Sequence, residues 1–124
     1  MEHVAFGRTC LRVSELCIGT MTFGTQADEE TSGAILDTAF DAGITFIDTA
    51  NMYPAGHDGG RAGLTEEIIG RWLTAGNKRE EVVLATKFYA PMCPKPWDMG
   101  GSRKHIIRAL DESLGRLQTD YVDL

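Results

Sequence analysis

A carboxylate, a phenol and an ammonium stand at positions in the sequence from which they could act together. Asp48 ends the apolar stretch ITFID, Tyr53 follows in the next loop, and Lys87 ends the stretch VVLATK. A buried charge at the end of a strand is unfavourable unless it is paired. Two neighbouring strands that end in opposite charges would satisfy each other, so we expect Asp48 and Lys87 to meet with Tyr53 beside them.

Such a cluster would be suited to proton transfer. An ion pair keeps the lysine charged in a partly dry site, and a positive charge beside a phenol favours the phenolate. Tyr53 would then be a usable general acid that protonates a carbonyl oxygen while hydride arrives at the carbon. The alternative for each residue alone is structural: Asp48 caps a turn, Lys87 extends into solvent and Tyr53 packs on a loop. The coincidence of all three favours a site.

Strand-like and helix-like segments alternate along the chain and would position these residues. VVLATK is a run of apolar and β-branched residues, which is typical of a parallel strand buried on both faces. Ile106, Leu110 and Leu117 recur at helical spacing after Ser102, a suitable N-cap. The pattern predicts a hairpin from 3–6 and 11–14, strands at 15–20, 44–48, 82–87 and 120–124, and helices at 28–42, 65–75 and 102–117.

Alternating strands and helices predict parallel strands joined by right-handed crossovers. An open doubly wound sheet, as in dinucleotide-binding dehydrogenases, would carry a G-x-G-x-x-G turn after its first strand. This chain has GTMTFGTQ there instead. A (β/α)8 barrel takes about 250 residues, and this chain of 124 residues holds about half of one. We therefore predict an α/β fold, a partial TIM barrel: the first four βα units preceded by a short N-terminal β-hairpin.

Composition indicates an ordinary globular chain, with 43% hydrophobic residues, 24% charged residues and a net charge of -6. Scattered basic residues argue against nucleic acid or an anionic membrane as partner. No apolar stretch reaches the roughly 20 residues that span a bilayer. The start MEHVAFGRT is not typical of a secretory signal, and Cys10, Cys17 and Cys93 fit no zinc spacing. We expect no metal site, a cytoplasmic location, and Cys17 within the core.

Five stretches together resemble the N-terminal half of the aldo-keto reductase family. They are GTMTFG, AFDAGITFIDTANMY, LTEEIIGRWL, VVLATK and SLGRLQTDYVDL, and they run in the family's order over nearly the whole chain. The family's catalytic tetrad is Asp, Tyr, Lys and His, and Asp48, Tyr53 and Lys87 match its first three positions. The long loop MYPAGHDGGRAGLTEE is similar to that of bacterial oxidoreductases related to potassium-channel β subunits.

The resemblance implies a cofactor and a substrate class. It implies NADPH-dependent reduction of aldehydes or ketones, with a small carbonyl compound as substrate. Gly19, Thr20 and Met21 match the segment that lines the nicotinamide, and Asp48 would lie beside the nicotinamide ribose. Thr20 has an alternative interpretation as a strand-end residue that bonds the backbone. The substrate itself, and the choice between NADPH and NADH, are set by segments outside these stretches.

The resemblance also implies what this chain lacks. Residues 1–124 would be the N-terminal half of the reductase domain, truncated in the fourth strand, before the catalytic His and the cofactor's phosphate site. His3, His57 and His105 do not replace that His, because none ends a strand; His57 follows Tyr53 and could reach the barrel mouth. We expect such a chain by itself to be inactive, and its open sheet edges to allow self-association. The alternative function is a non-catalytic remnant or a regulatory module that binds a partner through the half-barrel scaffold.

Overall fold

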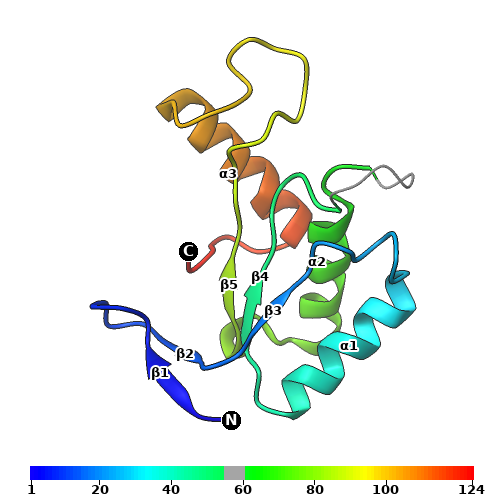
Figure 1. The fold of residues 1–124 in the computed structure, drawn as a ribbon. Coiled ribbons are helices and arrows are strands. Elements are labelled where there is room, and N and C mark those ends of the chain that lie inside the picture. The colour runs from blue at the N-terminus through cyan, green and yellow to red at the C-terminus, as the bar shows by residue number, and fades with distance from the viewer. Residues whose placement is uncertain (55–60) are drawn as a thin grey trace.

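A three-stranded parallel sheet forms the centre of the protein. The computed structural model describes residues 1–54 and 61–124 (Figure 1), so His57 and most of the predicted loop after Tyr53 lie outside the described residues. The strands are β3 (Cys17–Gly19), β4 (Phe46–Asp48) and β5 (Val83–Ala85), in that order across the sheet. Asp48 pairs with Gly19 on one side and with Ala85 on the other, so all three strands end at the same level.

A helix follows each strand of this sheet, as the alternating pattern predicts. They are α1 (Glu29–Asp41), α2 (Leu64–Gly76) and α3 (Arg103–Leu117), with a short 3-10 turn, η1 (Arg79–Glu81), before β5. Asp28 caps α1 by accepting from the Thr31 N–H, and Ser102 caps α3 by accepting from the His105 N–H. The two caps fix where the loops after β3 and β5 end.

The core lies between the sheet and the helices. Ile47 and Leu84 are neighbours in register, and both are buried against Leu36 of α1, Ile69 of α2 and Leu117 of α3. Because alternate residues of a strand point to opposite faces, the residues before and after this central position face away from the helices.

Cys17 corrects one sequence-based prediction. It lies one residue before Ile18, which packs against the core, so its side chain points to the opposite face of β3 and is exposed. The apolar stretch LCIG suggested burial, but the strand alternation decides the face. Asp48 occupies the same helix-free face of the sheet as Cys17, because each lies one residue from a core position, Ile47 and Ile18, and these two are register partners.

A two-stranded antiparallel hairpin closes the lower end of the sheet (Figure 1), as predicted. It comprises β1 (His3–Ala5) and β2 (Arg12–Ser14). The hydroxyl of buried Ser14 accepts hydrogen bonds from the N–H groups of Thr45 and Phe46, each at 3.1 Å. Phe46 also packs edge-on against Phe6. The hairpin is therefore anchored where β4 begins, which leaves the carboxyl ends of the strands at the other end of the sheet.

The predicted fourth strand, 120–124, does not form a regular strand. The chain runs beside β5, with Asp123 N–H bonded to the Leu84 carbonyl at 2.9 Å and Thr86 N–H bonded to the Leu124 carbonyl at 3.1 Å. The Leu84 N–H, however, is bound at 2.8 Å by the side chain of Asp123. A carboxylate thus takes the place of the carbonyl that would continue a ladder, and Arg79 holds it there at 2.9 Å.

The described residues therefore form an α/β fold with a parallel sheet of three strands and three helices, consistent with part of a (β/α)8 barrel. Among residues 1–54 and 61–124, no helix combines the length and apolar character needed to cross a membrane.

Gly70 should be intolerant of any side chain. A Cβ on Gly70 would overlap the Arg116 carbonyl oxygen and lie 2.8 Å from the Leu117 carbonyl carbon. To accommodate it, α2 and α3 would have to move apart. We expect Gly70→Ala to lower the free energy of unfolding by about 1–3 kcal/mol. Gly33→Ala is the matched control, because Gly33 lies inside α1 with open space at its Cβ; it should raise stability by up to about 1 kcal/mol. Urea unfolding measures both, and equal effects would contradict this account.

Candidate active site

The structure brings Asp48, Tyr53 and Lys87 together beyond the carboxyl ends of β4 and β5. Lys87 Nζ lies 2.5 Å from Asp48 Oδ2 and 3.4 Å from the Tyr53 hydroxyl. It also lies 4.9 Å from the centre of the Tyr53 ring. The side chains of Lys87 and Asp48 are 48% and 36% exposed, so the cluster is open to solvent on one side and accessible to a small molecule.

The ammonium of Lys87 is bound from three directions. Besides Asp48 and Tyr53, the Thr49 carbonyl accepts a hydrogen bond from it at 2.9 Å. Partial burial, the largest single influence, opposes the charge on Lys87. The hydrogen bonds and charges of Asp48 and Tyr53 together outweigh it, so the pKa of Lys87 is raised above its usual value. The arrangement thus holds a fixed positive charge against a phenol oxygen.

Backbone pairing beyond the strands sets the distance between the two charged residues. Thr49 N–H donates to the Ala85 carbonyl at 2.9 Å, and Asn51 N–H donates to the Lys87 carbonyl at 3.0 Å. The chain after β4 therefore continues alongside the chain after β5 for several residues. As a result, Asp48 and Lys87 emerge beside each other although 38 residues separate them in the sequence.

Tyr53 is held by the start of α2. Its N–H donates to the Ala50 carbonyl at 3.1 Å, and its carbonyl accepts from the N–H groups of Gly63 and Thr65 at 3.0 and 3.3 Å. The first N–H groups of a helix have no partner within the helix. The Tyr53 carbonyl supplies one, so the position of the phenol depends on the position of α2.

The three predicted nicotinamide-lining residues lie at and just after the end of β3, and they differ in exposure. Thr20 is fully buried, and both its N–H and its hydroxyl donate to the Asp48 carbonyl, at 3.1 and 2.9 Å. This is the strand-end bonding that was the alternative interpretation for Thr20. Gly19 is the register partner of Asp48 and has open space where a Cβ would sit. Met21 is 49% exposed.

Sequence reasoning missed a buried ion pair beneath the cluster. Glu66 is fully buried in α2, where Arg116 of α3 donates to it at 2.7 Å and the Thr86 hydroxyl donates at 2.6 Å. Thr86 directly precedes Lys87, so this pair fixes one side of the lysine. The signal was present: Glu66 lies three residues before Ile69 and seven before Leu73, which places a carboxylate on the buried face of α2.

The raised pKa of Lys87 gives a test of the cluster. We expect Asp48→Asn to lower the NMR titration midpoint of Lys87, because the variant removes a charge and a strong acceptor. A lysine whose pKa is higher in the folded state stabilises the fold below its unfolded pKa of about 10.4. The stability difference between wild type and variant should thus persist at neutral pH and shrink as pH rises through the folded pKa. Asp37→Asn is the control, since Asp37 pairs with Lys78 instead; an unchanged Lys87 midpoint in Asp48→Asn would contradict the geometry.

Comparison with known proteins shows which family the chain belongs to. The family model described as the aldo/keto reductase family matches residues 15–124. Over its whole length the chain is 53% identical to the uncharacterized oxidoreductase YrpG of Bacillus subtilis, 42% identical to a probable voltage-gated potassium channel subunit beta of Oryza sativa, and 39% identical to L-glyceraldehyde 3-phosphate reductase of Escherichia coli. It spans 39%, 36% and 35% of the lengths of these relatives. The chain belongs to the aldo/keto reductase family.

Proposed function

We propose that the complete protein reduces aldehydes or ketones with NADPH, and that residues 1–124 supply the proton donor of this reaction. The observation that carries the proposal is the contact of Lys87 Nζ with both Asp48 and the Tyr53 hydroxyl. Membership of the family supports it, and so does a relative that is named as a reductase. Because the chain spans less than two fifths of its relatives, the fourth catalytic group and the phosphate contacts of the cofactor are proposed to lie in residues outside it.

Tyr53 is the proposed acid. When a carbonyl compound is reduced, negative charge develops on its oxygen, and a phenol within hydrogen-bonding reach can supply the proton. When Tyr53 gives up its proton it becomes a phenolate, and the Lys87 ammonium, 3.4 Å from its oxygen, stabilises that negative charge. Asp48 and the Thr49 carbonyl hold the ammonium in place, so it does not have to reorient during the reaction.

The proposed nicotinamide site lies at the end of β3 and in the residues that follow it. Gly19 leaves open space beside Asp48, Met21 is accessible, and the bonds from Thr20 to the Asp48 carbonyl keep this segment beside β4. Gly19, Thr20 and Met21 would therefore line the ring, with Asp48 near the ribose. A bound nicotinamide cofactor supplies hydride to the carbonyl carbon.

A non-catalytic role is the second candidate, and the likeness to a probable potassium channel subunit beta favours it. In this case the scaffold would bind a partner, and the Asp48, Tyr53 and Lys87 cluster would carry no turnover. The sequence that follows Leu124 in the gene discriminates the two candidates. A nearby His and a later basic segment for phosphate binding would favour the enzyme.

Tyr53→Phe should abolish carbonyl reduction and leave cofactor binding nearly intact, because it removes only the hydroxyl. The protein is expressed with any sequence that follows Leu124 in its gene, and kcat/KM should fall about 100-fold or more. Tyr89→Phe is the control: it makes the same change on an exposed tyrosine in the loop after β5. Full turnover by Tyr53→Phe would remove this residue from the acid role.

Residues 1–124 expressed without further sequence should show no tight NADPH binding in a fluorescence titration, because the proposed phosphate contacts lie elsewhere. Micromolar affinity would overturn that placement.

We also propose that this segment alone self-associates through the edge of β3, which pairs only with β4 among the described strands. A monodisperse monomer in analytical ultracentrifugation would contradict the self-association.

A further inference from the structure

Lys87 stands just beyond the end of β5, where the Asn51 N–H binds its carbonyl on the side of β4. The last residue of β5 is Ala85, and Thr86, Lys87 and Phe88 continue without regular structure. A cavity of about 190 Å³ separates this segment from α3 and the end of the chain; its lining includes Thr86, Phe88, Ile106, Ala109, Val122 and Leu124. Tight packing therefore does not hold the segment on that side. Its position depends on polar contacts.

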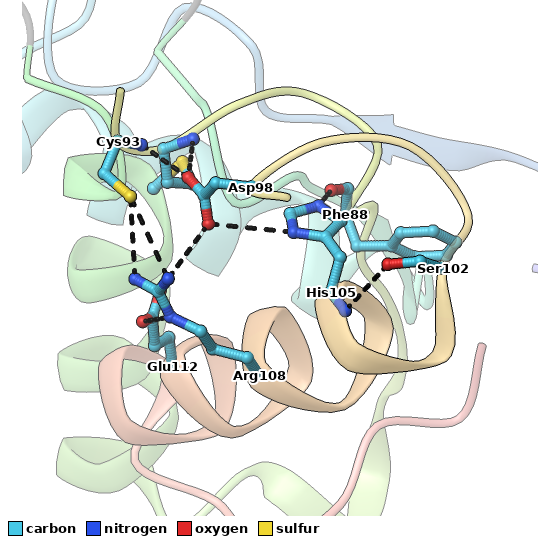
Figure 2. A network of polar contacts seen from close by, with 8 residues as sticks. Phe88, Cys93, Asp98, Ser102, His105, Arg108 and Glu112 are labelled. Atoms are coloured by element: carbon cyan, nitrogen blue, oxygen red, sulfur yellow. Dashed lines mark hydrogen bonds and ion pairs between the residues drawn. The ribbon is translucent and has the colours of Figure 1, made fainter. Parts of the chain in front are cut away.

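His105 contacts the residue that follows Lys87, Phe88. Figure 2 shows the imidazole of His105, in the first turn of α3, directed at the carbonyl of Phe88, and Nε2 lies 2.6 Å from that oxygen. A carbonyl oxygen can only accept, so Nε2 carries the proton. The side chain of His105 is 1% exposed, and its ring also meets Phe88 edge-on at 6.3 Å between centroids. The peptide group that follows Lys87 is thus anchored to a buried side chain.

The other edge of the His105 ring lies against the loop after β5. Its Nδ1 lies 3.7 Å from Asp98 Oδ1, and among the described residues this buried nitrogen makes no hydrogen bond. Asp98, also buried, accepts from the N–H groups of Met92 and Cys93 at 2.8 and 2.5 Å (Figure 2). Arg108 lies 3.3 Å from the same carboxylate. These contacts leave Asp98 little freedom to move, so its carboxylate stays beside the Nδ1 edge of the ring.

We propose that His105 is a positioning residue for Lys87: its Nε2–H holds the Phe88 carbonyl, and this contact sets where the ammonium meets Tyr53 and Asp48. The inference rests on the proposed function. It assigns His105 a role other than that of the fourth catalytic group, which is proposed to lie outside residues 1–124, because the imidazole is buried and makes its contacts with Phe88 and the loop after β5. Together with the bond from Thr86 to Glu66, it restrains the chain on both sides of Lys87.

Two amide substitutions separate positioning from simple filling of space. In His105→Gln the side-chain amide takes roughly the place of Nε2 and can donate to the Phe88 carbonyl. In His105→Asn the shorter side chain places its amide near Nδ1, where it can reach Asp98 but not Phe88. Both variants are polar and smaller than a well-packed ring, so a general loss of packing affects both.

Two measurements are made on protein carrying any sequence that follows Leu124. The first is steady-state carbonyl reduction. The second is the ¹³C NMR titration of Lys87, labelled at Cε and assigned by its loss in Lys87→Arg; this chain has only three other lysines, Lys78, Lys95 and Lys104. Ser14→Ala is the control for stability, because it removes a buried hydroxyl at the hairpin end of the sheet.

We expect His105→Asn to lower kcat about 10- to 100-fold, a loss typical of small displacements of a catalytic group, with a smaller change in KM. Its Lys87 midpoint should fall toward that of an ordinary lysine, and His105→Gln should restore both values. Ser14→Ala should lower the Tm and leave the Lys87 midpoint unchanged. Equal behaviour of the two amide variants, or an unchanged Lys87 midpoint in His105→Asn, would overturn the positioning role. If wild type reduces no carbonyl compound, the proposed function fails, and the titration still decides the inference.

Discussion

The ion pair of Lys87 and Asp48 depends on the segments after β4 and β5 leaving the sheet side by side. Each partner sits at or just past the end of a three-residue strand, where ladder hydrogen bonds become sparse. The bonds from Thr49 to Ala85 and from Asn51 to Lys87 continue the parallel pairing past that point. Without them the two charges would lie on independent loops, and the entropy of ordering both loops would oppose a contact at 2.5 Å.

Buried charge is concentrated beneath this ion pair. Glu66 and Arg116 connect α2 with α3, and the same carboxylate binds Thr86. Burying a carboxylate is unfavourable, and this one is stable because an ionised donor and a hydroxyl both satisfy it. A hydrophobic pair of similar size would hold the helices together equally well, but it would offer Thr86 no acceptor. The polar pair therefore connects helix packing with the strand end that carries the lysine.

Features governed by neighbours in the sequence could be predicted. The alternation of elements, the cap at Ser102, and the convergence of Asp48, Tyr53 and Lys87 at one end of the sheet all follow from local periodicity and parallel topology. Their catalytic roles remain predictions. Cys17 was assigned to the core because its neighbours are apolar, although the face of a short strand is set by which of its residues meets the helices.

Two contacts between distant segments could not be predicted. The side chain of Asp123 accepts a hydrogen bond from the Leu84 N–H, so residues 120–124, whose sequence has good strand character, pair irregularly with β5. The contact of His105 with Phe88 depends on the angle at which α3 begins after a long loop. Neither leaves a pattern in the sequence, because each is a choice among several acceptors that only the assembled fold brings within reach.

The close contact at Gly70 makes α2 a rigid spacer. The middle of this helix, at Gly70, touches the backbone of α3 at residues 116 and 117, and N–H groups at the start of the helix donate to the carbonyl of Tyr53. The absence of a side chain at the middle of α2 thereby influences where the start of the helix holds Tyr53. A larger residue at position 70 would push α2 away from α3. It would thereby move Tyr53 relative to Lys87 without changing any reacting group. The geometry of proton transfer in this fold can thus be adjusted by a residue that never meets a substrate.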